Sequence, residues 1–271
     1  MEKKLGVLII HGMGSQKEGF ESDLVDELID RVDGDANDIA WQGVYWQDIT
    51  EPRELEYLER AGDVVDLDWD TARTFMATAF GDAAAYQFTG TGGTYEHIHD
   101  RIRARIKKLY VEKLGSTDVP LIVLAHSLGG HMMSNYIWDM QPNLKGEVRA
   151  KWSESLSPFE RAETLAGFIT FGCNIPLFSF AYDQPTPISF PGSALSAEDA
   201  DRAAWLNYYD KDDILGWPLQ PLSPEFAATV TDDIQINVGS VLTAGTPLSH
   251  VGYWTDNDFT KPVAKFISEF L

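Results

Sequence analysis

Two short apolar runs constrain the fold of this chain more than any other feature of its sequence. They are Leu5–Ile10 and Val119–Ala125, and neither alternates apolar with polar residues. A strand with one face in water alternates, whereas a strand of a parallel sheet is covered on both faces and is apolar throughout. The two runs therefore predict central strands of a parallel sheet.

Four further segments have the composition of strands, and helical patterns lie between them. These segments are Asp38–Tyr45, Leu165–Phe171, Ala204–Tyr209 and Ile234–Val238. Alternation of strands with helices is typical of βαβ units. The sequence therefore predicts the α/β class, with a mostly parallel sheet flanked by helices in a single domain that spans residues 1–271.

The clearest helical pattern is Tyr95–Leu114. Its apolar residues Ile98, Ile102, Ile106 and Leu109 follow a 4-4-3 spacing, which places them on one face. The basic residues between positions 101 and 108 occupy the other faces, and we interpret them as a solvated surface rather than an anion site. Further helices are predicted at Glu51–Gly62, Asp70–Gln87, His131–Met140 and Pro262–Phe270.

Charge and composition argue against several classes of partner. The chain has 21 basic and 42 acidic residues, a net charge of −21 that repels the phosphates of nucleic acids. No apolar run approaches the ~20 residues of a membrane span, and no secretory signal is visible. A lone cysteine, Cys173, excludes an internal disulfide framework, although a disulfide-free exported protein would share that feature. We expect a cytoplasmic protein without a membrane span or a nucleic-acid partner.

The run Val119–Ala125 leads directly into the sequence His-Ser-Leu-Gly-Gly, and a helical pattern follows. A turn this sharp strains the residue at its apex and requires small residues two positions to either side. Ala125 and Gly129 meet that requirement around Ser127. An ordinary helix-capping serine would explain the position of Ser127 but not its small neighbours. Ser127 is therefore the candidate nucleophile.

A serine hydroxyl is a weak nucleophile unless a base removes its proton. His250 lies after the last predicted strand and before the terminal helix, and it is the candidate base. The acid that orients the histidine should lie between serine and histidine in the chain. A predicted strand ends close to Asp210, Asp212 and Asp213, and the Asp-x-apolar-apolar pattern favours Asp212, with Asp213 as the rival.

An acyl-transfer site also needs N–H donors for the oxyanion of the tetrahedral intermediate. The amide of Leu128, directly after the nucleophile, is one candidate. The loop after the first predicted strand supplies the other, and the amide of Met13 between Gly12 and Gly14 is preferred. His11 in the same loop is interpreted as an anchor rather than a base.

With these blocks in place, the chain resembles the α/β-hydrolase superfamily, and within it the lipase and carboxylesterase group. The blocks run from Ile9 to Tyr253 in the family's order. The resemblance implies a central parallel sheet and a cofactor-free, metal-free acyl-enzyme mechanism acting on small-molecule carboxylic esters. Ala125 departs from the usual glycine. The segment 51–94 adds about two helices and is a candidate cap, and the segment 174–196 is a candidate lid loop.

Two other functions fit the same residues. A thioesterase or an acyltransferase would use the same serine, histidine and acid with a different leaving group or acceptor. A catalytically silent member of the fold, used as a binding protein, would be expected to lack one of the three residues, and all three are present in this sequence.

Overall fold

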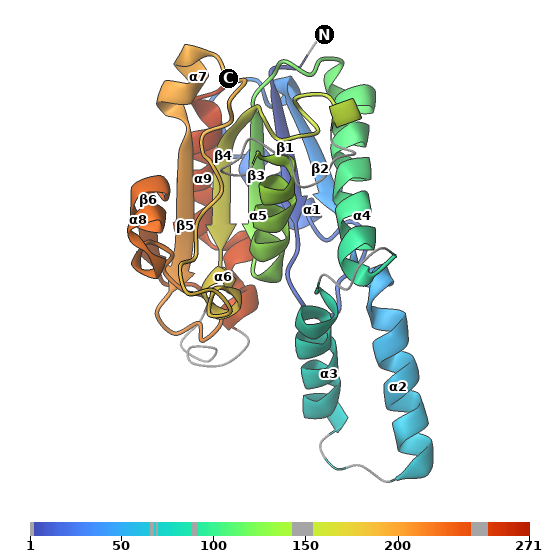
Figure 1. Ribbon diagram of the computed structural model, residues 1–271. Coiled ribbons are helices and arrows are strands. Elements are labelled where there is room, and N and C mark those ends of the chain that lie inside the picture. Colours follow the sequence, from blue (N-terminus) through green and yellow to red (C-terminus); the bar gives the residue numbers. More distant parts are fainter. Residues whose placement is uncertain (1–2, 66–67, 69, 88–91, 143–153, 240–248) are drawn as a thin grey trace.

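A parallel sheet of six strands forms the centre of the protein (Figure 1). The computed structural model describes residues 3–65, 68, 70–87, 92–142, 154–239 and 249–271. Within them the strands lie in the order β2-β1-β3-β4-β5-β6, and all neighbouring pairs are parallel. Their bounds are β1 Leu5–Ile10, β2 Ile39–Val44, β3 Leu121–His126, β4 Leu165–Phe171, β5 Ala204–Asp210 and β6 Asp232–Ile236.

The predicted α/β class and the mostly parallel sheet are confirmed. β1 and β4 have the predicted bounds, and the other strands are shifted by one or two residues at one or both ends. Helices cover both faces of the sheet, so successive side chains of a strand enter two separate cores. Leu8 and Val123 face one core, whereas Val7 and Leu124 face the other. This double coverage explains why the two apolar runs do not alternate.

The helices form one layer on each face of the sheet. The first layer, which contains Leu24 and Leu28, packs over β1 and β4 on one side. Its helices are α1 Ser22–Ile29 and α9 Asn257–Ser268. The second layer lies on the opposite side (Figure 1). Its helices are α4 Thr94–Lys108, α5 Leu128–Met140, α6 Ile175–Ser179 and α8 Pro224–Thr229, and a short helix α7, Ala197–Arg202, precedes β5.

The helix predicted at Tyr95–Leu114 is present as α4 and a wider final turn, Leu109–Leu114. Its predicted apolar stripe is buried: Ile98, Ile102, Ile106 and Leu109 are all 0% exposed. The basic residues lie on the other faces, and Arg101 pairs with Asp48 through two hydrogen bonds of 2.9 Å. The α4 surface is thus at least partly neutralised by neighbouring carboxylates.

The terminal helix begins earlier than predicted. The sequence pattern indicated a start at Pro262, a residue common in first helical turns. In the structure α9 begins at Asn257, because the side chain of Asp256 accepts a hydrogen bond from the N–H of Asp258 and caps the helix. Phe259 on the added turn is fully buried. Pro262 therefore lies inside the helix.

The segment 51–94 contains the two expected extra helices, α2 Glu51–Val64 and α3 Asp70–Ala85. They pack against each other and project from the body of the protein as an arm (Figure 1). The arm extends from the edge of the sheet at which the strands end. We refer to α2 and α3 together as the arm.

The segment 174–196 is the first part of the connection from β4 to β5. It begins with α6, and its later part returns to the start of β4, where the N–H of Gly192 donates to the carbonyl of Leu165. Ile188 in this segment is buried in the core. Of the helices that the structure describes, none combines the length and the apolar character needed to cross a membrane.

We expect the α4 stripe to contribute strongly to stability. Replacing Ile102 by Ala should lower the free energy of unfolding by about 2–5 kcal/mol, because it leaves a cavity between α4 and the sheet. The matched control is Lys107→Ala on the exposed face of α4, expected to change stability by less than about 0.5 kcal/mol. Urea denaturation followed by circular dichroism measures both, and similar losses in the two variants would contradict this assignment of faces.

Candidate active site

The order of the strands locates the site before any side chain is considered. The chain leaves β1 towards β2 on one side and later returns to β3 on the other side of β1. In open α/β sheets, ligands bind beyond the carboxyl ends of the strands at such a reversal point. Gly12 follows β1 there, and Ser127 follows β3.

Ser127 occupies the turn between β3 and α5 in a strained conformation. Its φ of 51° and ψ of −124° lie in a region that side-chain-bearing residues rarely adopt. The next residue, Leu128, is the first residue of α5, so its N–H has no partner within the helix. The strained turn predicted from Ala125 and Gly129 is thus present around Ser127.

Glycines allow the surrounding backbone to reach this turn. A Cβ atom on Gly12 would lie 2.5 Å from the Cβ of Ser127, and a Cβ on Gly129 would lie 2.5 Å from the carbonyl oxygen of His11. Real Cβ contacts are not this short, so larger residues would force the two loops apart. Close packing of the loop after β1 against Ser127 therefore depends on both glycines.

His250 is brought to Ser127 across 123 positions of sequence. It lies in a short helical turn, Ser249–Thr255, directly before α9. Its Nε2 atom is 2.7 Å from the Oγ of Ser127, which can donate its hydroxyl proton to that nitrogen. Ser127 is 0% and His250 6% exposed, so this contact is shielded from water.

The acid that contacts His250 is Asp213 and not the preferred Asp212. The Nδ1–H of His250 donates to the Asp213 carboxylate, whose oxygens are 2.8 and 3.0 Å away. A tight turn explains the difference: the N–H of Asp213 donates to the carbonyl of Asp210, and the N–H of Asp212 donates to the Asp210 side chain. Asp213 is directed inward and is 4% exposed, whereas Asp212 borders an outer cavity.

Further donors hold the Asp213 carboxylate in place. The hydroxyl of Tyr253 donates to it at 2.9 Å, and the N–H of Leu215 donates to it at 2.9 Å. Burial alone would raise the pKa of Asp213, but the hydrogen bond and charge interaction with His250, together with the other donors, lower it below its ordinary value. Asp213 therefore remains ionised at neutral pH and stabilises a positive charge on His250.

Tyr253 is a site residue that the sequence analysis did not identify. Its hydroxyl donates to Asp213 and accepts the N–H of Asp210 at 2.9 Å, so it connects the acid to the end of β5. Burial, and next the charge of Asp213, raise the pKa of Tyr253, which keeps the phenol protonated as a donor. Its position three residues after His250 is the only sequence signal that could have indicated it.

His126 is a neutral structural partner of His250. Its Nε2–H donates to the backbone carbonyl of His250 at 2.8 Å, and the two rings lie 4.7 Å apart. Burial, and next the neighbouring His250, lower the pKa of His126 to about 3. A neutral His126 fixes the backbone of His250 without placing a second positive charge beside it.

His11 anchors the loop after β1, as the sequence analysis predicts. Its ring stacks on Trp46 at 4.8 Å, its Nε2 accepts the N–H of Trp46 at 3.2 Å, and its carbonyl accepts the indole N–H at 3.1 Å. Burial lowers the pKa of His11 to about 4, so it is uncharged at neutral pH. Met13 follows in this loop and is partly buried against the core.

The thiol and the metal-ligating side chains of the described residues do not form a competing site. Cys173 is fully buried, and burial raises the pKa of its thiol to about 12, so the reactive thiolate is not populated at neutral pH. Among the described residues, no group of three or more His, Cys, Asp or Glu side chains has an arrangement that could hold a metal ion.

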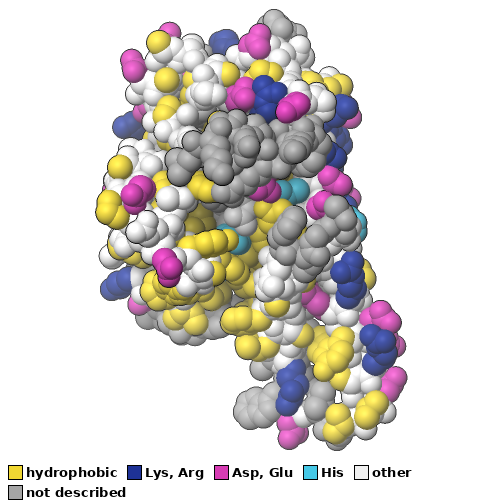
Figure 2. Space-filling model, viewed as in Figure 1, with side chains coloured by type: hydrophobic (Ala, Val, Ile, Leu, Met, Phe, Trp, Pro, Cys, Tyr) yellow, Lys and Arg dark blue, Asp and Glu magenta, His cyan; other side chains and the backbone are white. Residues whose placement is uncertain are grey.

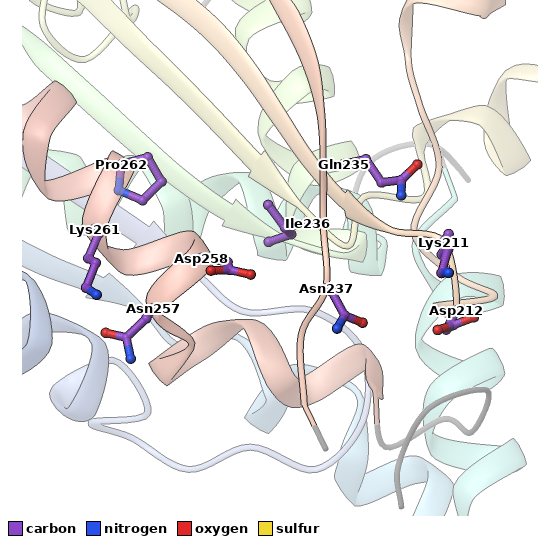
Figure 3. Close-up of a pocket in the computed structure, with 9 residues that line it drawn as sticks. All are labelled: Lys211, Asp212, Gln235, Ile236, Asn237, Asn257, Asp258, Lys261 and Pro262. Atoms are coloured by element: carbon purple, nitrogen blue, oxygen red, sulfur yellow. The ribbon is translucent and has the colours of Figure 1, made fainter. Parts of the chain in front are cut away.

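An open cavity of about 720 Å³ (Figure 3) is lined by residues other than those of the site. Lys211, Asp212, Asp258 and Lys261 line it together with residues of β6 and the start of α9, and none of the three hydrogen-bonded residues of the site contributes to it. Two of these side chains are basic and two are acidic, so their charges cancel. Asp212 therefore belongs to this outer surface.

We expect Gly12 to be essential for the geometry of the serine. Replacing Gly12 by Ala should displace the loop or Ser127, and it should lower the reaction rate of Ser127 at least about tenfold, since small displacements at a reacting centre are costly. Gly62→Ala in α2 is the matched control, because its Cβ meets no atom within 4 Å. The rates follow from labelling with a serine-reactive phosphonate, and equal rates in both variants would contradict this role.

The hydrogen-bonded arrangement of Ser127, His250 and Asp213 is the feature of this chain that indicates its function. Comparisons with models of known protein families and with curated protein sequences find no match to it.

Proposed function

We propose that this protein is a serine hydrolase that cleaves carboxylic esters through an acyl-enzyme intermediate. The observation that carries the proposal is one continuous, buried chain of hydrogen bonds from Ser127 through His250 to Asp213. A nucleophile, a base in contact with it and an acid that orients the base are the requirements for activating a serine. A serine with a purely structural role would need neither the base nor the acid.

In the proposed reaction, the hydroxyl oxygen of Ser127 attacks the ester carbonyl carbon while its proton passes to Nε2 of His250. The tetrahedral intermediate then expels the alcohol, which takes the proton from His250. A water molecule, deprotonated by His250, attacks the acyl carbon of the acyl-serine. The bond to the serine oxygen then breaks, His250 returns the proton to that oxygen, and the carboxylic acid and free Ser127 are released. Asp213 stabilises the positive charge that His250 carries between these steps.

The amides of Leu128 and Met13 are the proposed donors to the oxyanion. The Leu128 N–H lies at the start of α5, where the helix dipole also favours negative charge. Met13 follows Gly12, which contacts Ser127. Two such donors would stabilise the charge as it develops on the carbonyl oxygen.

The fold supports the narrower proposal that the chain is an α/β-hydrolase. The supporting features are the parallel sheet, the strained serine between a strand and a helix, and the chain order of serine, acid and histidine. Each is a property of the sheet and its carboxyl-end loops, and none depends on the arm.

Exposed apolar surface supports an ester with an apolar acyl group. Hydrophobic side chains gather on the face around α6 and along the arm (Figure 2). Among them, Phe180 and Tyr182 are 75% and 68% exposed, and Tyr57 and Val64 on the arm are 63% and 86% exposed. Exposed apolar side chains that gather on one face commonly mark a binding region.

Labelling tests the nucleophile. A fluorophosphonate should form one adduct with the wild-type protein on Ser127, none with Ser127→Ala, and a much slower one with His250→Ala because the base is lost. Ser134→Ala on α5 is the matched control and should react like the wild type. Mass spectrometry locates the adduct, and a folded wild-type protein that remains unlabelled at Ser127 would overturn the proposal.

Separate replacement of the two aspartates tests the acid. Asp213→Asn should reduce kcat for a nitrophenyl ester by roughly 10⁴-fold, because the histidine loses the partner that fixes its tautomer and balances its charge. Asp212→Asn, one position away, should change kcat by no more than a few fold. A larger loss in Asp212→Asn would refute the role of Asp213.

A further inference from the structure

A buried polar cluster joins the arm to the loop that follows β1. Asp82 on α3 is 0% exposed, and its carboxylate accepts the N–H of Gly14 at 3.0 Å and the hydroxyl of Thr50 at 2.5 Å. The side-chain amide of Gln47 donates to it at 3.2 and 3.3 Å. One carboxylate of the arm therefore holds the backbone of the loop that carries the proposed oxyanion donor Met13.

A second carboxyl group, from Glu54 on α2, is close enough to Asp82 for the charge of Asp82 to raise its pKa. Both oxygens of Glu54 are shielded from water, and among the described residues no N–H or hydroxyl donor reaches them. A proton held between Glu54 and Asp82 would give these oxygens a hydrogen-bond partner. Gly81 leaves space for the Glu54 carboxyl group, because a Cβ atom at position 81 would lie 2.7 Å from Oε1 of Glu54.

We propose that Asp82 is a positioning residue of the site, that it holds the Gly12–Gly14 loop through the Gly14 N–H, and that the proton it shares with Glu54 makes this hold depend on pH. This inference rests on the proposed hydrolase function for its effect on catalysis. The hydrogen bonds themselves do not depend on that function. The arm is then a support of the oxyanion loop as well as an apolar surface.

The charge balance gives the direction of the pH effect. Burial, and next the charge of Asp82, raise the pKa of Glu54 to about 8 from the ordinary value of 4.5, and Glu51 on α2 acts in the same direction. Burial also raises the pKa of Asp82, against the hydrogen bonds from Thr50, Gly14 and Gln47. The groups facing Asp82 from the loop after β1 and from the turn Gln47–Ile49 are neutral donors. Above a pH of about 8, two carboxylates therefore face each other without a shared proton.

The same shift has a consequence for stability. Between pH 4.5 and about 8 the folded protein retains a proton on the pair that the unfolded chain releases. Because the folded state then binds more protons, stability falls as the pH rises through this window, and the loss is complete above it. Glu54→Gln carries no titrating proton and should lack this part of the pH dependence.

The first experiment observes Gly14 directly and needs no catalysis. In isotope-labelled wild-type protein, the amide resonance of Gly14 should shift with pH and titrate at about 8. Glu54→Gln, whose side-chain N–H can replace the shared proton, should abolish this titration, whereas Glu59→Gln on the exposed face of α2 should leave it unchanged. A Gly14 amide that does not titrate, or that titrates equally in Glu54→Gln, would overturn the proposal.

The second experiment tests the effect on catalysis. Asp82→Ala should lower kcat for a nitrophenyl ester roughly tenfold with little change in KM, because the loop acts on the transition state. Asp82→Asn retains an oxygen that can accept the Gly14 N–H and should restore most of kcat. In the wild type kcat should fall as the pH rises past about 8, and this fall should be absent in Glu54→Gln.

The two proposals fail in different ways. If phosphonate does not label Ser127 but Gly14 titrates as expected, the hydrolase proposal is wrong and the carboxyl pair is confirmed. If Ser127 is labelled and esters are hydrolysed, equal kcat values and equal pH profiles in wild type, Asp82→Ala and Glu54→Gln refute the positioning role. A fall in kcat with no rescue by Asp82→Asn would also count against it.

Discussion

The close approach of two backbones at the carboxyl ends of β1 and β3 is the constraint on which the rest of the site depends. Gly12 contacts the Cβ of Ser127, and Gly129 contacts the carbonyl of His11. The contacts bring the loop after β1 and the start of α5 together beside Ser127. Both strands are buried between two helical layers, and close packing there fixes their positions. The positions of the loops that follow the strands are thereby fixed as well.

Burial of so many polar groups requires that each finds a partner, since an unpaired buried charge is very costly. Asp213 meets this requirement through donors from His250, Tyr253 and Leu215. His126 avoids a buried charge by remaining neutral, because burial lowers its pKa to about 3. The region around His250 can therefore be nearly dry and still hold one negative carboxylate. A dry surrounding also strengthens the interaction between that carboxylate and the histidine.

The sequence predicted those parts of the fold and site that depend on local patterns. Apolar runs predicted the strands, and the small residues around Ser127 predicted the strained turn. The choice between Asp212 and Asp213 depends instead on one tight turn after β5, in which Asp210 binds two backbone N–H groups, and no spacing rule predicts which way the next side chains point. Contacts between distant segments, such as that of Asp82 with Gly14, leave no local pattern at all.

The position of Asp82 connects the arm to the chemistry in a way that its apolar surface alone would not. The Gly14 N–H is held by α3, whereas the loop bearing it is held on its other side by His11 and Trp46 in the body of the protein. A displacement of α3 must therefore either break the Gly14 hydrogen bond or move the loop with it. Phe75 and Phe80 on α3 are 42% and 50% exposed. Binding energy gained by an apolar group on α3 would then be coupled to the position of the loop, because both act on the same helix. Above a pH of about 8, the second negative charge of the carboxyl pair would oppose the packing of α2 against α3 and would weaken that coupling.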